Sequence, residues 1–460
     1  MRFRIPVFPV KHLSFRCGLF AVMLGAGLLS SCEDFVPRGD PVVDIRPSWN
    51  NAAAAGAESL HDWWRGFDSV QLDSLVDRAL AGNFKMQAAH QRLMAARALR
   101  GAGESNFRPA AVASTASERN PQATAQYFLV GIDASWELPL FGRAVNAGRL
   151  LQAQVDDALS DEAAVRAALT ADVVRAYLES RFAQRELGVV EELANVADDR
   201  RQRQATRIRL GLDDALASTA DLQQAPQARA ESGSLQRIRK RGLESLAALL
   251  GSTAIDESWV GNEGELRVPA VPATLPADLL RRRPDIRHAE AAVERAAAQL
   301  GIARADRYPS VSIAGALTAS IPVAGHVRSS TNSIVSAGPL ITLPLFDWGL
   351  RKAQAEAHGA ALRAAVLDYR QVVLDAVAEV EAALLQVEEA MEQSALQAAA
   401  MDSAEQAERR AQAQRQLGLQ RQVTALDLKR EALLARQSLV HAERDRSLAL
   451  VHLMLALGAG

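Results

Sequence analysis

Two adjacent carboxylates, Asp213 and Asp214, follow directly after the turn sequence Leu210-Gly211-Leu212. Carboxylates at such a place can cap the first turn of a helix, because the N–H groups there have no partner within the helix. If several copies of the chain surrounded a pore, the same side chains would form an acidic ring that selects cations or gates by charge. The sequence leaves both roles open.

A second copy of this turn, Leu417-Gly418-Leu419, carries Gln420 and Arg421 in place of the two carboxylates. Any acidic gate is therefore confined to the first copy. In both copies two leucines flank a glycine, which can adopt the left-handed conformation that a helix reversal needs. We expect exposed tips that either simply reverse the chain or also contact a partner.

Residue patterns typical of enzymes do not occur. The eight histidines are scattered, and none lies at metal-ligand spacing from another. The sequence contains no Walker motif and no nucleophile-elbow motif. We therefore expect no catalytic residue, no metal, no cofactor and no enzymatic activity. The formal net charge of -2 gives no indication of a nucleic-acid partner.

The first 31 residues resemble a bacterial signal peptide. A basic start precedes the apolar stretch "CGLFAVMLGAGLL" at 17–29, and the next residues are Ser30, Ser31 and Cys32. This ending resembles the lipobox, after which the cysteine is acylated. We expect Cys32 to begin the mature chain and to carry palmitate or similar chains, each buried CH₂ contributing roughly 0.8 kcal/mol. The alternative is an ordinary signal peptide with a chance cysteine.

Most of the remaining chain is an internal repeat. "LPLF" occurs at 138–141 and again at 343–346. Matched positions lie about 200 residues apart before the strands and about 205 apart at "LPLF". The expected organisation is an N-terminal equatorial segment at 32–69, a first repeat at 70–251, an equatorial linker at 252–275 and a second repeat at 276–460.

Each repeat shows the same order of elements. Apolar residues three and four apart predict helices, and alternating apolar residues predict strands. Pro226 lies inside the first return helix and predicts a kink or break there. The expected elements are lead-in helices at 70–107 and 276–308, strands at 110–138 and 310–343, long helices at 143–209 and 348–416, and return helices at 212–250 and 419–457.

The clearest strand places Asp133, Ser135 and Glu137 on one face and Trp136 on the other. Strands of about ten residues have the length of tilted membrane strands, with one face toward lipid and one toward a lumen. Four strands cannot close a barrel, whereas three chains would give twelve strands around a water-filled bore. We expect these three polar residues to line the lumen, and the strand-to-helix junctions to contain Pro139, Phe141, Pro344 and Phe346.

Four segments resemble signatures of the TolC-like outer-membrane efflux proteins, specifically the lipoprotein subfamily that serves resistance-nodulation-division pumps. The resemblance covers the chain from about residue 30 to its end, and "RRPDI" at 282–286 is its most specific part. The segments are "WWRGFDSVQLDSLVDRALAGN", "SWELPLFGR", "LLRRRPDIRHAEAAVERAAAQLGIARADRYPSVS" and "LPLFDWG".

The resemblance implies a mainly α-helical chain with a four-stranded β contribution. Three chains would form a twelve-stranded outer-membrane β-barrel and a periplasmic α-barrel. It implies a passive exit duct that works with a periplasmic adaptor and an inner-membrane resistance-nodulation-division transporter. Leu210, Gly211 and Leu212, with Leu417, Gly418 and Leu419, would meet the adaptor.

Other functions remain compatible with parts of this pattern. The duct of a type I protein secretion system would share the fold, although the lipid anchor favours efflux. A periplasmic coiled-coil scaffold or adaptor is the alternative from another class. An adaptor would have one hairpin and a lipoyl-like domain, not two hairpins with membrane-length strands. The substrates do not follow from the sequence, because a passive duct need not select them.

Overall fold

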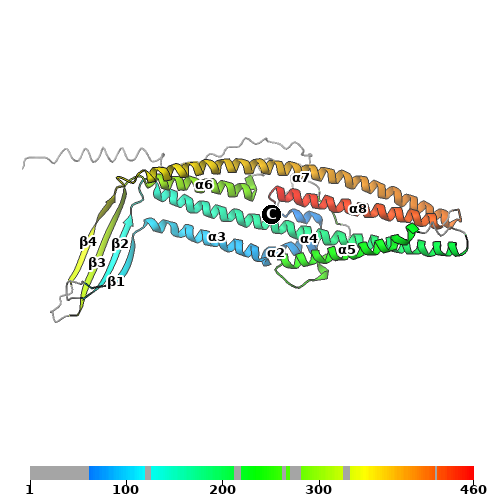
Figure 1. Cartoon of the computed structure of the whole chain (residues 1–460), viewed down its shortest axis with the longest axis horizontal. Coiled ribbons are helices and arrows are strands. Elements are labelled where there is room, and N and C mark those ends of the chain that lie inside the picture. Colours follow the sequence, from blue (N-terminus) through cyan, green and yellow to red (C-terminus); the bar gives the residue numbers. More distant parts are fainter. Residues whose placement is uncertain are drawn as a thin grey trace, which may run out of the picture. The chain divides into compact units, whose positions relative to one another are not determined.

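The structure is a computed structural model that describes residues 62–119, 126–211, 219–261, 266–269, 281–324, 332–419 and 422–459. The predicted signal peptide, Cys32, Leu212, Asp213 and Asp214 lie outside these residues. Within the described ranges, no helix is both long enough and apolar enough to cross a membrane. The elements are η2 (Trp63–Phe67), α2 (Val70–Gly82), α3 (Phe84–Ala102), η3 (Gly103–Phe107), β1 (Ala110–Arg119), β2 (Gln126–Glu137), α4 (Arg143–Arg209), α5 (Thr219–Leu249), η5 (Glu257–Val260), α6 (Pro284–Ala305), β3 (Ser310–Ala324), β4 (Asn332–Thr342), α7 (Leu350–Gln416) and α8 (Gln422–Ala456), as labelled in Figure 1.

The described residues form two compact units. The first unit takes its described residues from 94–157 and 289–369, and the second from 62–93, 158–288 and 370–459. The long helices α4 and α7 each contribute to both units.

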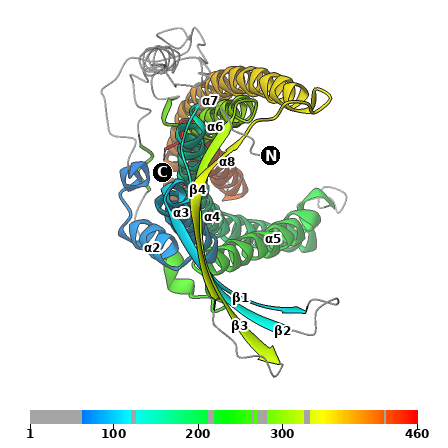
Figure 2. The same cartoon turned by 90° about the vertical axis from the view of Figure 1, so that its left-hand side faces the viewer.

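The first unit contains one antiparallel sheet with the strand order β1-β2-β3-β4, and the strands lie side by side in Figure 1 and Figure 2. Strand β2 of the first repeat pairs with β3 of the second, with Trp136 opposite Ile313 and Ser135 opposite Ala314. Strands β1 and β4 are the edges of this sheet. Pro339 lies on β4, and an edge strand tolerates its missing N–H.

Helices of the first unit form the row α3-α4-α6-α7. The buried side chains of α6 are mainly alanines, which allow its neighbours to approach closely. Polar links join each helix to the next: Arg100–Gln152 at 2.6 Å, Arg149–Glu294 at 2.7 Å and Tyr369–Glu290 at 3.5 Å.

Helices of the second unit form the row α5-α4-α8-α7. Val190 of α4 packs in a cluster with Leu235 of α5, and Leu193 of α4 packs with Leu433 of α8. Ion pairs join each helix to the next: Arg229–Asp198 at 2.6 Å, Arg185–Glu443 at 2.8 Å and Arg436–Glu405 at 3.4 Å. The two first-repeat helices therefore lie on one side of the row and the two second-repeat helices on the other, and the repeats meet where α4 contacts α8.

The return helix of each repeat ends against the lead-in helix of the same repeat. The Asn83 side-chain amide donates to the Leu249 carbonyl at 2.9 Å, and the Arg283 guanidinium donates to the Ala456 carbonyl. Asn83 is extended and divides the first lead-in into α2 and α3. The expectation of one lead-in helix over 70–107 is therefore wrong. The break lets the Asn83 side chain cap α3, where it accepts from the Lys85 amide at 2.8 Å.

Of the kink or break expected at Pro226, the break is wrong. Helix α5 runs without interruption from Thr219 to Leu249 with Pro226 inside it. Ala225 and Ala228 beside the proline are buried, and Ala228 packs against Ala183 and Val190 of α4. This packing on both sides of the proline holds the helix together despite the lost backbone hydrogen bond.

The backbone corrects the register of the repeat. Phe141 and Gly142 have left-handed φ values of 54° and 74°, and Trp348 and Gly349 have φ values of 56° and 84°. These two pairs lie 207 positions apart, as do the left-handed glycines Gly211 and Gly418 and the pair Gly251 and Gly458. The 205-residue offset at "LPLF" is thus two residues out of register, because the two identical tetrapeptides are not structurally equivalent. The structural counterpart of Phe141 is Trp348, not Phe346.

Candidate functional sites

The two tips are exposed turns. Leu210, Leu417 and Leu419 are each more than two-thirds exposed. Gly418 donates its N–H to the Arg415 carbonyl at 2.9 Å, and Leu419 donates to the Gln414 carbonyl at 2.9 Å. These two backbone hydrogen bonds, together with the left-handed glycine, end α7 without any side-chain cap. The leucines are therefore not needed to end the helix and remain available for contact.

The sheet has one polar and one apolar face in its centre. Asp133 and Ser135 share a face with Ser114, whose hydroxyl donates to the Asp133 carboxylate at 3.1 Å. The opposite face is apolar. It carries Phe128, Val130, Ile132, Ile313, Leu317 and Ile321, all at least 39% exposed. Side chains that point to alternate faces of the strands create this separation.

The strand-to-helix junctions differ between the repeats. At the first, the Phe141 ring stacks on Tyr308 with centroids 5.0 Å apart and an interplanar angle of 15°. At the second, Phe346 and Trp348 meet edge to face at 4.6 Å, and Trp348 is 90% exposed. Pro139 and Pro344 follow the last residues of β2 and β4 and cannot extend the strand ladders.

A half-open hollow of about 460 Å³ lies among α4, α5 and α8 in the second unit. Glu186 lines it and is only 6% exposed. Its carboxylate contacts His441 Nε2 at 2.6 Å and accepts from the Gln437 amide at 3.0 Å. Gln437 also donates to Glu231 of α5 at 2.6 Å, so three helices share one polar network.

Charge in this network follows from its contacts. Burial raises the pKa of Glu186, but hydrogen bonds from His441 and Gln437 outweigh it and hold the net pKa below its usual value. The hydrogen bond to Glu186 raises the pKa of His441 above its usual value. The pair is therefore ionic over a wider pH range than either group alone would allow.

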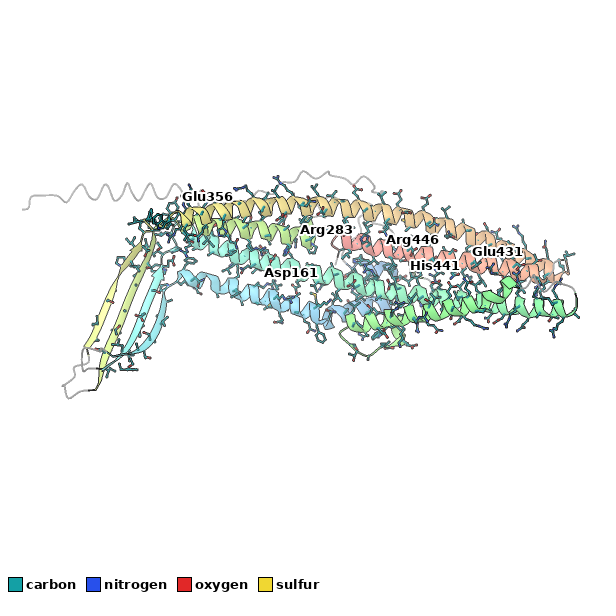
Figure 3. All side chains as sticks on the ribbon, viewed as in Figure 1. Asp161, Arg283, Glu356, Glu431, His441 and Arg446 are labelled. Atoms are coloured by element: carbon teal, nitrogen blue, oxygen red, sulfur yellow. The ribbon has the colours of Figure 1, made fainter. Side chains whose placement is uncertain are left out.

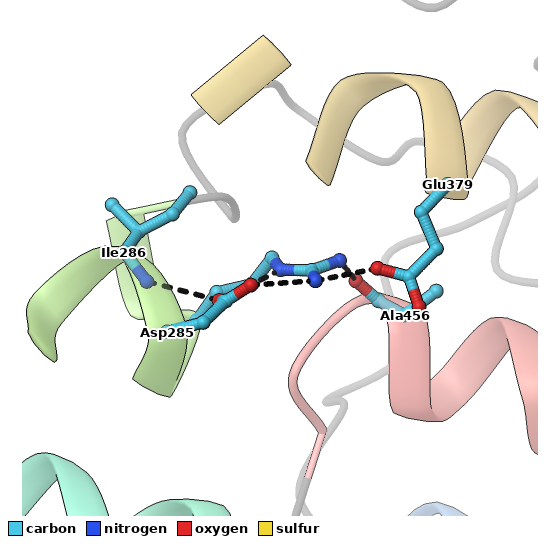
Figure 4. Close-up of polar contacts among 5 residues, drawn as sticks. Asp285, Ile286, Glu379 and Ala456 are labelled. Carbon is cyan, nitrogen blue, oxygen red and sulfur yellow. Dashed lines mark hydrogen bonds and ion pairs between the residues drawn. The ribbon is translucent and has the colours of Figure 1, made fainter. Parts of the chain in front are cut away.

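Arg283 of the "RRPDI" segment is buried and forms a second polar cluster, shown in Figure 4. Its guanidinium contacts Asp285 at 2.9 Å and Glu379 of α7 at 2.6 Å, besides the Ala456 carbonyl at the end of α8. Burial raises the pKa of Asp285, but the bond from Arg283 outweighs it and lowers the net value. Pro284 begins α6, a position at which the missing N–H of proline costs no helical hydrogen bond.

The sequence did not predict that the residues of either polar cluster contact one another. The residues lie far apart in the chain, and His441 looked like one of several scattered histidines. Figure 3 labels Arg283, directly before α6, and His441 of α8, both in the second unit. Among the described residues, no group of three or more metal-ligating side chains is close enough to hold a metal ion.

Comparisons with known proteins bear directly on these features. The family described as outer membrane efflux protein matches residues 75–252 and 275–459. The chain belongs to this family. It is a family of outer-membrane channel proteins and not an enzyme family.

Individual relatives match along almost their whole length. Outer membrane protein OprJ of Pseudomonas aeruginosa is 31% identical over 487 aligned residues, covering 99% of this chain and 97% of OprJ. The probable efflux pump outer membrane protein TtgC of Pseudomonas putida is 27% identical, covering 96% of this chain and 95% of TtgC. The solved structure of the outer-membrane channel OprN is 28% identical and superposes with a TM-score of 0.75, covering 92% of this chain and 99% of OprN.

Proposed function

We propose that this outer membrane efflux protein is the exit duct of a tripartite pump and conducts small toxic compounds passively to the exterior. The observation that carries the proposal is the open sheet of four membrane-length strands, apolar on one face, joined to 67-residue helices. Such a helix spans roughly 100 Å, which is long enough to reach far into the periplasm. Similarity to TtgC, a probable efflux pump outer membrane protein, supports efflux rather than type I protein secretion.

Three copies of the chain complete the duct. Open strand edges are not tolerated in lipid, so β1 and β4 need partners from other copies. Twelve strands enclose a bore, whereas eight would be filled by their own side chains. In this homotrimer Asp133, Ser135 and Glu137 line the lumen, and the apolar face meets outer-membrane lipid.

The partners are a periplasmic adaptor and an inner-membrane resistance-nodulation-division transporter, which supplies the energy. The exposed leucines at 210, 417 and 419, together with Gly211 and Gly418, are the adaptor-contacting tips, and Leu212 is added to this set from its place in the sequence. Exposed leucines around a tight turn fit a partner that brings apolar side chains of its own.

Cys32 carries the lipid anchor in this proposal. Metabolic labelling with a palmitate analogue should mark the wild-type chain and should not mark Cys32→Ser. Equal labelling of both chains would remove the anchor from the proposal without touching the duct.

Deletion of the gene tests the efflux role. In a strain that expresses the cognate pump, loss of the chain should lower the minimum inhibitory concentration of some toxic compounds several-fold. Re-expression of the chain should restore it. Unchanged sensitivity across a broad panel of compounds, with adaptor and transporter present, would sink the efflux role.

A further inference from the structure

The two repeats contact each other within one chain, and this internal contact serves as a template for a contact between two copies of the chain. At this internal seam, Phe141, two residues before α4, stacks on Tyr308, two residues before β3. Further along the same seam, a side chain at Gly301 of α6 would collide with Asn146 of α4. Gly301 is buried, so only a residue without a side chain fits there.

Each member of this seam has a counterpart in the other repeat. The lead-in and first-strand positions are 200 apart, as the strand starts Ala110 and Ser310 show. The junction and long-helix positions are 207 apart, as the left-handed pairs show. The counterparts are Trp348 for Phe141, Arg108 for Tyr308, Ala353 for Asn146 and Gly101 for Gly301.

Three of the four templates are covered within the chain: Phe141 is half-buried, and Asn146 and Gly301 are buried, whereas Tyr308 is 44% exposed. Trp348 is 90% exposed, and Arg108 and Ala353 are exposed as well. A side chain built on Gly101 would meet nothing within 4 Å. Glycine is unfavourable inside a helix, so Gly101 within α3 weakens that helix without serving any packing in its own chain.

We propose that the junction between β4 and α7 is a docking site for the α3–β1 turn of a second copy of this chain. Arg108 of the second copy covers the Trp348 ring, and its Gly101 receives the backbone of α7 around Ala353. The contact repeats the internal seam with changed chemistry, because a guanidinium over an indole replaces two stacked rings. Such cation–π contacts form when the charge lies within about 6 Å of the ring.

This inference rests on the proposed trimer and deepens it by naming the residues of the seam. A matched pair of glycine variants tests it on the purified full chain in detergent. Gly101→Leu puts a good helix former into space that is open within its own chain, so each chain should fold with unchanged helix content. It should nevertheless lose the trimer mass in light scattering.

Gly148→Leu is the control. A side chain at Gly148 also meets nothing within 4 Å, but Gly148 lies on α4, whose neighbours on both sides belong to its own chain. This variant should keep the trimer mass. Loss of trimer in both variants, or in neither, would overturn the docking site.

Disulfide trapping provides a second readout. Arg108→Cys with Trp348→Cys should give covalent dimers and trimers on a denaturing gel after mild oxidation, because bonded cysteines need Cα atoms within about 7 Å. Arg108→Cys with Lys352→Cys, four residues further along α7, should stay monomeric on the gel. Equal trapping of both pairs, or of neither, contradicts the seam.

The unaltered protein separates the two hypotheses. If it has trimer mass while the variants behave against expectation, the seam is wrong and the duct stands. If the unaltered chain is monomeric in every detergent tested, both the trimer of the proposed function and the seam fail.

Discussion

At the scale of single residues, Arg283 ties together the ends of two helices and a third helix beside them. It joins the end of α8 to the start of α6 and reaches Glu379 of α7. Removing one partner of a buried ion pair leaves the others without compensation. Because both carboxylates are nearly half exposed, water recovers part of that loss.

We therefore expect Arg283→Met to lower the stability of the folded protein by about 1–3 kcal/mol. Urea or thermal unfolding followed by circular dichroism would measure the change. The neighbouring Arg282, which is exposed, provides the control, and Arg282→Met should change stability by less than about 0.5 kcal/mol. Equal effects of the two substitutions would remove the special role of Arg283.

The Glu186–His441 pair gives stability a defined pH dependence. The pKa of His441 is raised in the folded state, so its contribution is present below the usual histidine pKa of about 6.5 and is lost as pH rises through the raised value. The pKa of Glu186 is lowered, so its contribution is present above about pH 4.5 and is lost as pH falls through the lowered value. Arg444, Asp445 and, through Gln437, Glu231 also face this pair.

We expect the wild-type melting temperature to fall between pH 6 and pH 8, and His441→Gln to reduce that fall. The pH-dependent part of the free energy of unfolding that the substitution removes should be about 1 kcal/mol or less, because His441 is partly exposed. His288→Gln is the control, since His288 lies 4.0 Å from Asp161 and is half exposed. A pH profile of His441→Gln that matches the wild type would contradict the pair's contribution.

At the scale of elements, glycines set the distance between helices. A side chain at Gly242 of α5 would collide with Ser180 of α4 and would lie 3.2 Å from the Ala176 carbonyl. Backbone atoms cannot move aside, so the helices would have to separate. Gly233 on the same helix meets only the end of the flexible Arg237 side chain, at 3.5 Å.

Gly242→Leu should therefore destabilise the protein by about 1–3 kcal/mol through overpacking. Gly233→Ala should stabilise it by about 0.5–1 kcal/mol, because alanine is the better helix former. Chemical denaturation of the two variants beside the wild type would measure both signs. A Gly242→Leu variant as stable as the wild type would show that α4 and α5 are not in close contact.

Most elements could be read from local pattern, because hydrophobic period and glycine position act within a few residues. Helix α4 over Arg143–Arg209 and the glycine at each tip are examples. The continuity of α5 through Pro226 could not be predicted, because it depends on tertiary packing, in which Ala228 contacts α4. The register predicted at "LPLF" was wrong because it aligned identical residues, whereas the left-handed backbone turns at Phe141 and Trp348 determine the structural alignment.

The polar clusters lay beyond sequence reasoning for a related reason. Arg283 and Glu379 are 96 residues apart, and Glu186 and His441 are 255 apart. No local period links such positions, and only the row of helices brings them together. The "RRPDI" segment drew attention to Arg283 as part of the family resemblance, but nothing in it indicated Glu379 as a partner.

At the scale of the whole molecule, the proposed trimer determines what Asp213 and Asp214 can do. One copy offers two carboxylates beside an exposed turn, whereas three copies around one axis offer a ring. The ring attracts cations only if the chains converge at this tip. Its effect is therefore a property of the assembly and not of the single chain.

We expect purified wild-type channels in planar lipid bilayers to prefer cations. Asp213→Asn combined with Asp214→Asn should reduce that preference several-fold, as measured by reversal potentials in a salt gradient. The adjacent pair Glu388 and Glu389, exposed on α7, provides the control, and its double glutamine variant should keep the wild-type selectivity. Unchanged selectivity in the aspartate variant would leave helix capping as the role of these residues.

The open edges of the sheet also bear on how the protein is made. The sheet of a single chain has β1 at one edge and β4 at the other, and lipid cannot form hydrogen bonds with the backbone groups of either edge. A newly exported chain therefore cannot be stably inserted in the bilayer as a monomer, so insertion and assembly must be coupled. A mutant chain that can bind a neighbour through only one of its two edges would hold wild-type chains in incomplete assemblies that cannot insert. An assembly-defective allele should therefore be dominant over the wild type.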